Sequence, residues 1–139
     1  MALQNWNTRV GLNNVGSFQV SGKPFASGSI LAHVSGANSI VVRFPKVTKW
    51  VQISPHQDQL NRELRVAFSQ DGLHRNENFR VYSSGSFTGP LDIKVSELHF
   101  MSEDSAVFTF DIVAGLTNID AASVETAEGP NWKGSDGVG

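Results

Sequence analysis

The chain contains no cysteine and little charge, and each absence removes a class of protein. Without cysteine there is neither a disulfide framework nor a thiolate nucleophile, which argues mildly against a small secreted scaffold. Charged residues make up 17% of the chain, against roughly 25% in typical domains. Eleven Lys and Arg face thirteen Asp and Glu, a net charge of -2, so no basic surface for nucleic acid or an anionic membrane is indicated. We expect neither among its partners.

Long apolar stretches are also missing. The first ten residues, MALQNWNTRV, have no apolar core of a signal peptide, and no run approaches the roughly 18 residues that a membrane span needs. We therefore expect a soluble protein that is synthesised in a cytoplasm.

What the chain does contain is alternation of apolar and polar residues with a period of two, the pattern of half-buried strands. With 139 residues the chain has the length of one domain. The alternating runs lie between residues 39 and 116, and they are SIVVRF (39–44), KWVQIS (49–54), ELRVAFS (63–69), FRVYS (79–83), LDIKVSELHF (91–100) and AVFTFDIVAGL (106–116).

The runs are separated by turn signals, and no segment of ten or more residues shows a helical period. QDGLHRNEN after residue 69 is interpreted as a polar excursion, and MSED (101–104) as a short hairpin link. A change of phase within 91–100 predicts a β-bulge near Ser96 and Glu97. The sequence predicts an all-β protein, a single β-sandwich or jelly-roll-like domain, with a barrel as the alternative.

The two ends differ from the middle. Residues 1–38 predict an N-terminal arm with the first strand or strands of the same domain, and 16–22 and 29–34 are the candidates for them. Residues 39–116 predict the sandwich body, and 117–139, without any strand pattern, an extended C-terminal arm. Each arm carries the same dipeptide, Asn5-Trp6 in one and Asn131-Trp132 in the other.

A search for reactive groups gives no candidate for catalysis, for a metal or for a cofactor. The histidines are not spaced as metal ligands, and neither a nucleophile elbow nor a phosphate-binding loop is present. His56 and Asp58 share a loop, where solvated polar residues are the simpler interpretation, and His99 is expected to be a surface histidine. The sequence therefore favours a non-enzymatic protein.

The aromatic residues offer two hypotheses. Trp50 and Tyr82 could form an exposed stacking platform for sugars. Alternatively, they cover the second face of the sandwich or a subunit contact, which we favour. In the arms, we expect Trp6, Phe18, Phe25 and Trp132 to be interaction anchors, because ordering an arm costs about 1–2 kcal/mol per residue and needs apolar burial in return. The arms either fold back on their own body or exchange with a neighbour in an assembly.

Several stretches also carry a resemblance to a known family. They are LQNWNTRVGLNNVGSFQVSGKPFASGS, FPKVTKWVQI, LRVAFSQDG, LDIKVSELHF, FDIVAGLTNI and GPNWKGSDGVG, which together span nearly the whole chain. The chain resembles a family of small virion structural proteins of tailed bacteriophages, notably marine ones. The resemblance supplies no active-site residues.

The resemblance implies synthesis in the host bacterial cytoplasm and a place in the virion, on the outer surface of the head, as a decoration (cement) protein that stabilises the shell. Such proteins are commonly sandwich or jelly-roll folds and often trimeric, so the implied partners are copies of the chain itself, with a trimer favoured, and the major capsid protein. A tail, neck or fibre-adaptor component is the alternative. A carbohydrate-binding sandwich with Trp50 and Tyr82 as its platform is a further one.

Overall fold

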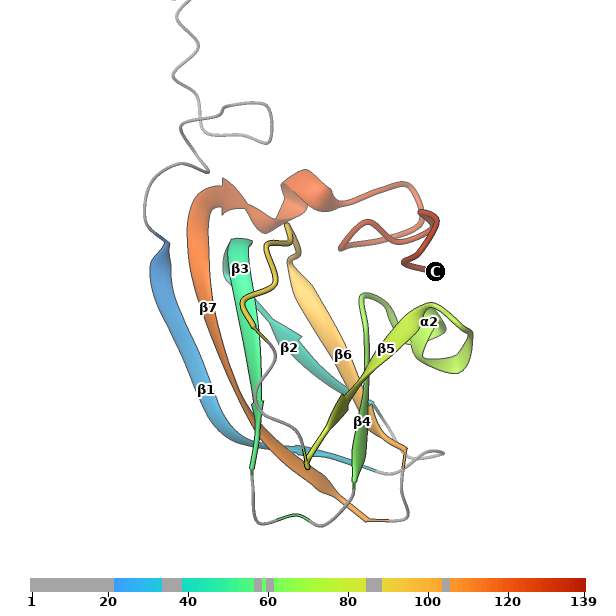
Figure 1. The fold of residues 1–139 in the computed structure, drawn as a ribbon. Helices are drawn as coiled ribbons and strands as arrows, with labels where there is room; N and C mark the ends of the chain where they lie inside the picture. The colour runs from blue at the N-terminus through green and yellow to red at the C-terminus, as the bar shows by residue number, and fades with distance from the viewer. Residues whose placement is uncertain (1–21, 34–38, 57–58, 60–61, 85–88, 104–105) are drawn as a thin grey trace, which may run out of the picture.

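A computed structural model describes residues 22–33, 39–56, 59, 62–84, 89–103 and 106–139. Within these residues the strands form two antiparallel sheets that pack against each other (Figure 1). This confirms the prediction of an all-β, sandwich-like domain, and the two separate strand orders exclude the barrel for the part of the chain described. The candidate strand at 16–22 lies almost wholly outside the described residues.

The first sheet has the order β1-β7-β3, with β7 in the centre. Its strands are β1 (Lys23–Ala32), β7 (Phe108–Asp120) and β3 (Lys46–Pro55). The register shifts between Ser27 and Ile30 in β1, and twice between Lys46 and Trp50 in β3. Gly115 of β7 lies beneath the indole ring of Trp50, which leaves no room for a β-carbon there. The central strand thus needs glycine at this position.

The second sheet has the order β2-β6-β4-β5. Its strands are β2 (Ile40–Arg43), β6 (Glu97–Ser102), β4 (Glu63–Ala67) and β5 (Asn78–Tyr82). Five of the six predicted runs correspond to a strand within four residues at either end, and these strands are β2, β3, β4, β5 and β7. One face of each strand contacts the core, which gives the sequence its tendency to alternate.

The core lies between the sheets and is built from alternate residues of the strands. Phe110 of β7 and Phe100 of β6 meet across the interface with ring centroids 4.5 Å apart, and both side chains are fully buried. Ile53 and Leu64 extend the same cluster from β3 and β4. These contacts make the two sheets one hydrophobic unit.

The prediction of one bulged strand over 91–100 is wrong. Leu91 pairs with Val51 of β3, beside the first sheet, whereas β6 begins only at Glu97 and belongs to the second sheet. The change of phase therefore marks the passage of the chain from one sheet to the other. For the same reason MSED is not a hairpin link: Met101 and Ser102 are strand residues, and β6 and β7 lie in different sheets.

Two short helices were not predicted. In QDGLHRNEN a five-residue helix, α2 (Gln70–His74), begins after Ser69, whose side chain caps it by accepting a hydrogen bond from the Gly72 amide at 3.1 Å. A 3-10 helix, η2 (Ala121–Val124), follows β7, which continues to Asp120 rather than ending near residue 116. Neither helix is long enough to show a period in the sequence.

Within the described part of the chain, no helix has the length and apolar character needed to cross a membrane.

Candidate functional site

Residues 121–139, here called the C-terminal segment, fold back on the body of the same chain (Figure 1). A tight turn forms where Thr126 and Gly129 exchange backbone hydrogen bonds. The Trp132 amide then donates a hydrogen bond to the Val124 carbonyl at 2.7 Å. Asn131 and Trp132 both have positive φ, 59° and 62°, which is rare outside glycine. Such a backbone persists only where surrounding contacts hold it.

The side chain of Asn131 provides those contacts. It is fully buried, and its amide group donates to the carbonyl oxygens of Phe68 and Glu97, at 2.6 and 2.7 Å. Its oxygen accepts from the Ser96 amide at 2.6 Å and from the Glu97 amide at 3.3 Å. One side chain thus joins the C-terminal segment, the end of β4 and the start of β6.

Trp132 is the second attachment and is half-buried. Its indole nitrogen donates to the Lys94 carbonyl at 2.5 Å, and its ring packs against a small buried cluster of Val47, Ile119 and Val124. The Trp132 of the sequence prediction is therefore anchored to its own subunit. Part of its ring remains at the surface.

The end of the C-terminal segment contacts α2. The Ser69 hydroxyl donates to the Val138 carbonyl at 2.6 Å, and Lys133 lies 3.7 Å from the carboxylate of Asp71. Gly72 of α2 is packed so closely that a β-carbon would come within 2.7 Å of the Val138 oxygen. This close contact holds Val138 beside Phe68.

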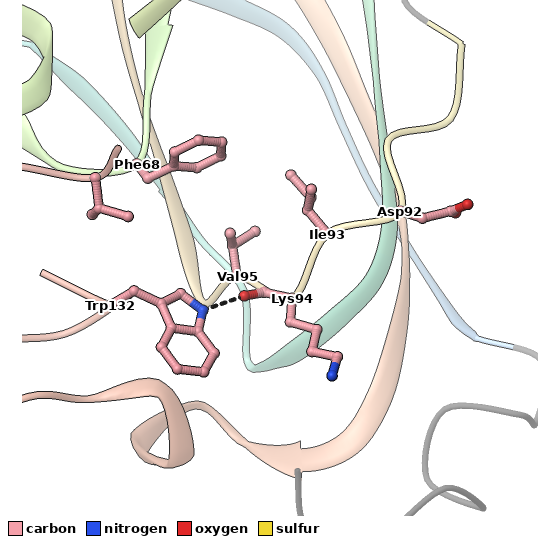
Figure 2. A pocket seen from close by; sticks show the side chains of 7 residues that line it. Phe68, Asp92, Ile93, Lys94, Val95 and Trp132 are labelled. Carbon is pink, nitrogen blue, oxygen red and sulfur yellow. Dashed lines mark hydrogen bonds between the residues drawn. The ribbon is translucent and has the colours of Figure 1, made fainter. Parts of the chain in front are cut away.

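An apolar hollow of about 370 Å³ lies between this segment and the body. We call it the Trp132 groove, and Figure 2 shows Trp132, Phe68, Val95 and Ile93 around it with Lys94 and Asp92 at its margin. Val138 completes the lining. The volume lies at the lower end of the range for ligand sites, and the walls offer apolar contact rather than reactive groups. Such a hollow suits one large apolar side chain.

Sequence reasoning identified one wall of this groove, Trp132, and missed the rest. Ile93 and Val95 were assigned to a strand, and Phe68 to the core face of another. Asn131 was noted only as part of a repeated dipeptide. A usable signal was present: a lone Asn among glycines is the residue type that tolerates a left-handed backbone and can bond main-chain groups on both sides.

The remaining predicted anchors and aromatics lie elsewhere. Phe25 of β1 is half-buried and packs edge-on against Phe44, with ring centroids 5.1 Å apart, while Trp6 and Phe18 lie outside the described residues. Trp50 and Tyr82 occupy outward-facing positions of different sheets, on β3 and β5, so the structure does not bring them together as one platform. Tyr82 is 49% exposed.

His99 is buried, contrary to the expectation of a surface histidine. It points away from the sandwich core, yet only 6% of it is exposed, and its Nε2 lies 2.6 Å from the carboxylate of Glu97. Burial lowers the pKa of His99, and the hydrogen bond and charge of Glu97 oppose that shift without reversing it. Burial thus favours the neutral form of the ring.

His56 bonds to the carboxylate of Asp111, which is far from it in the sequence. Its Nε2 lies 2.9 Å from Asp111 of β7, whereas Asp58 is outside the described residues. The pKa of Asp111 is lowered, first by the hydrogen bond from the Ser29 amide and then by that from His56. No group of three or more His, Asp and Glu within the described residues could hold a metal ion.

No known family, curated protein or solved structure matches the chain.

Proposed function

We propose that this chain is a non-enzymatic structural component of a bacteriophage particle, a decoration (cement) protein that binds the outside of the head and stabilises the shell. The observation that carries the proposal is the Trp132 groove, an apolar hollow of about 370 Å³ whose walls are held in place by the buried side chain of Asn131. The sequence resemblance to small virion structural proteins supports it independently.

In this proposal the protein acts by non-covalent association and catalyses no reaction. Association through apolar burial and neutral hydrogen bonds needs a rigid surface with little charge, and only 17% of the residues are charged. In a symmetric shell each subunit repeats the same weak contact many times, so attachment to the lattice becomes effectively permanent. Such a protein would act by resisting expansion of the shell under the pressure of packaged DNA.

The test is the copy number and position of the protein in purified particles, measured by quantitative mass spectrometry and cryo-electron microscopy. A decoration protein is expected in hundreds of copies on the head. Six or twelve copies would instead assign it to the tail or neck. Absence from the particles would overturn the proposal.

Light scattering of the isolated protein gives a second measurement. Decoration at threefold positions of a shell predicts a trimer. A variant with a charged groove, Ile93→Asp, is expected to stay folded, because Ile93 is only partly buried, and to lose attachment to shells. Unchanged attachment of this variant would show that the groove is not the binding surface.

A further inference from the structure

An ionisable pair is buried on the outer face of β6, where the C-terminal segment is attached. Glu97 and His99 are only 8% and 6% exposed, and the His99 Nε2 lies 2.6 Å from the Glu97 carboxylate. The backbone of the same Glu97 is bonded to the Asn131 side chain, which accepts from its amide at 3.3 Å and donates to its carbonyl at 2.7 Å. The ionisable pair and the attachment of the segment thus share one residue.

The second ring nitrogen of His99 has no hydrogen-bond partner. Its Nδ1 is buried without a hydrogen bond to any described residue. An ionised carboxylate only accepts, so the hydrogen bond to Glu97 assigns the proton of the neutral ring to Nε2 and leaves Nδ1 as a bare acceptor. A second proton would create a buried N–H without an acceptor, which is unfavourable while the ring stays covered.

The charges around His99 come from three elements. Besides Glu97 of β6, the charged groups that face the ring are Arg43 of β2 and Lys133 of the C-terminal segment. From β4, Ala67 lies opposite His99 and carries no charge. The only anion among the charged groups is already shared, because the Arg43 Nε lies 3.7 Å from the Glu97 carboxylate. A cation at His99 would therefore meet two other cations and half-occupied negative charge.

Lys133 is the charge that moves with the C-terminal segment. Its amine lies 3.7 Å from the carboxylate of Asp71, which is the charge that α2 contributes. Burial lowers the pKa of His99 most, Glu97 opposes the shift, and Arg43 and Lys133 add smaller decreases. If the segment moves off β6, water gains access to the ring and Lys133 leaves, so the open form takes up a proton more readily than the closed form.

We propose that a proton on His99 weakens the attachment of the C-terminal segment and so opens the Trp132 groove in acid. Two walls of the groove, Trp132 and Val138, belong to this segment and leave when it opens. Coupling of this kind is reciprocal, so opening becomes up to about tenfold more favourable for each pH unit below the ordinary histidine pKa of about 6.5. The coupling concerns the groove itself, whereas a loss of shell attachment in acid would also rest on the proposed function.

The reciprocal effect gives the sharpest test. In Asn131→Ala the segment loses its buried attachment, so the proton affinity of His99, titrated by NMR at the ring Cε1–H, should rise about threefold or more. Asn118→Ala, an exposed change on β7, should leave it unchanged. Protection of the Phe100 amide shows that the body stays folded during the titration. Equal proton affinity in the wild type and Asn131→Ala would overturn the proposal.

A second variant keeps the test decisive if Asn131→Ala does not fold. Trp132→Ala loosens the same segment at its other attachment, the hydrogen bond to the Lys94 carbonyl, and should raise the proton affinity of His99 in the same direction. An unchanged affinity in a folded Trp132→Ala protein counts against the coupling.

The effect of acid on the groove is measured at the Trp132 indole N–H. Its exchange with water, corrected for the intrinsic effect of pH, should speed up at least about threefold in the wild type from pH 7 to pH 5. His99→Gln should remove most of this increase. The same increase in both proteins would show that His99 does not control the groove. None of these results bears on whether the protein is found in particles, so the two proposals fail separately.

Discussion

The central strand of each sheet is covered differently. In β7 of the first sheet, buried and half-buried residues alternate from Phe108 to Val113, whereas all six residues of β6 in the second sheet are buried. The outer face of β6 is covered because Leu73 of α2 packs on Ala67 and Met101, and because the C-terminal segment is bonded to Glu97. The second sheet thus lies between two layers, and the C-terminal segment is part of the folded body.

Removing Asn131 is expected to have the largest effect on this arrangement. Asn131→Ala leaves the buried amides and carbonyls of Ser96, Glu97 and Phe68 without their partner, at about 1–3 kcal/mol for each unsatisfied group. Four such groups at the lower end of that range give an expected total loss of about 4 kcal/mol in the free energy of unfolding, measured by urea denaturation. Asn118→Ala, an exposed change of the same kind on β7, is the matched control and should cost less than 0.5 kcal/mol, roughly the limit for such surface sites.

A substitution in β7 tests how the first sheet is covered. In the described residues the side chain of Trp50 lies over Gly115 on the outer face of β7. Gly115→Ala would force the indole ring to move, and overpacking of this kind costs about 1–3 kcal/mol. Gly28→Ala should be much milder, since its β-carbon would meet only the Asp111 carboxylate at an ordinary 3.4 Å. Equal melting temperatures for the two variants would contradict the packing of Trp50 on β7.

Trp132→Phe is expected to have a smaller effect than either. It keeps an aromatic ring against Val47 and Val124, although a single ring replaces the two-ring indole. It removes the hydrogen bond to the Lys94 carbonyl, which is worth about 1 kcal/mol. Urea denaturation measures this loss in the free energy of unfolding. A loss as large as that of Asn131→Ala would mean that Trp132, and not Asn131, holds the C-terminal segment.

The smallest expected effect is a dependence of stability on pH. The pKa of His99 is lowered in the folded protein, so the unfolded chain takes up a proton first as pH falls. Stability from neutral His99 is complete above its unfolded pKa of about 6.5 and is lost as pH falls through that value toward the folded pKa. The charged groups facing His99 are Glu97, Arg43 and Lys133.

Unfolding free energies of the wild type and His99→Gln between pH 7 and pH 5 test this dependence. The wild type should lose stability over this range, and the variant should lose less. Parallel curves for the two proteins would show that the acid dependence arises elsewhere.

The sequence predicts the sheets better than it predicts what covers them. Alternation located β2 to β5 and β7 because a core on one face imposes a period of two on each strand. It failed at 91–100, where Leu91 and Phe100 serve different sheets, and at α2, which is too short for a helical period. The groove could not be predicted, since its walls Phe68, Ile93 and Trp132 come from three separate segments. Trp132 stands out in the sequence by its size. For Asn131 the sequence offers only an Asn among glycines, and the main-chain groups that it bonds, in Phe68, Ser96 and Glu97, cannot be predicted from it.

The central claim is that the C-terminal segment forms a fixed part of the body through Asn131. Amide hydrogen exchange of Ser96 measured by NMR tests it most directly, because that amide donates to the Asn131 side chain at 2.6 Å. We expect protection of the Ser96 amide close to that of Phe100 in the core, and loss of that protection in Asn131→Ala while Phe100 stays protected. Rapid exchange at Ser96 in the wild type would contradict it.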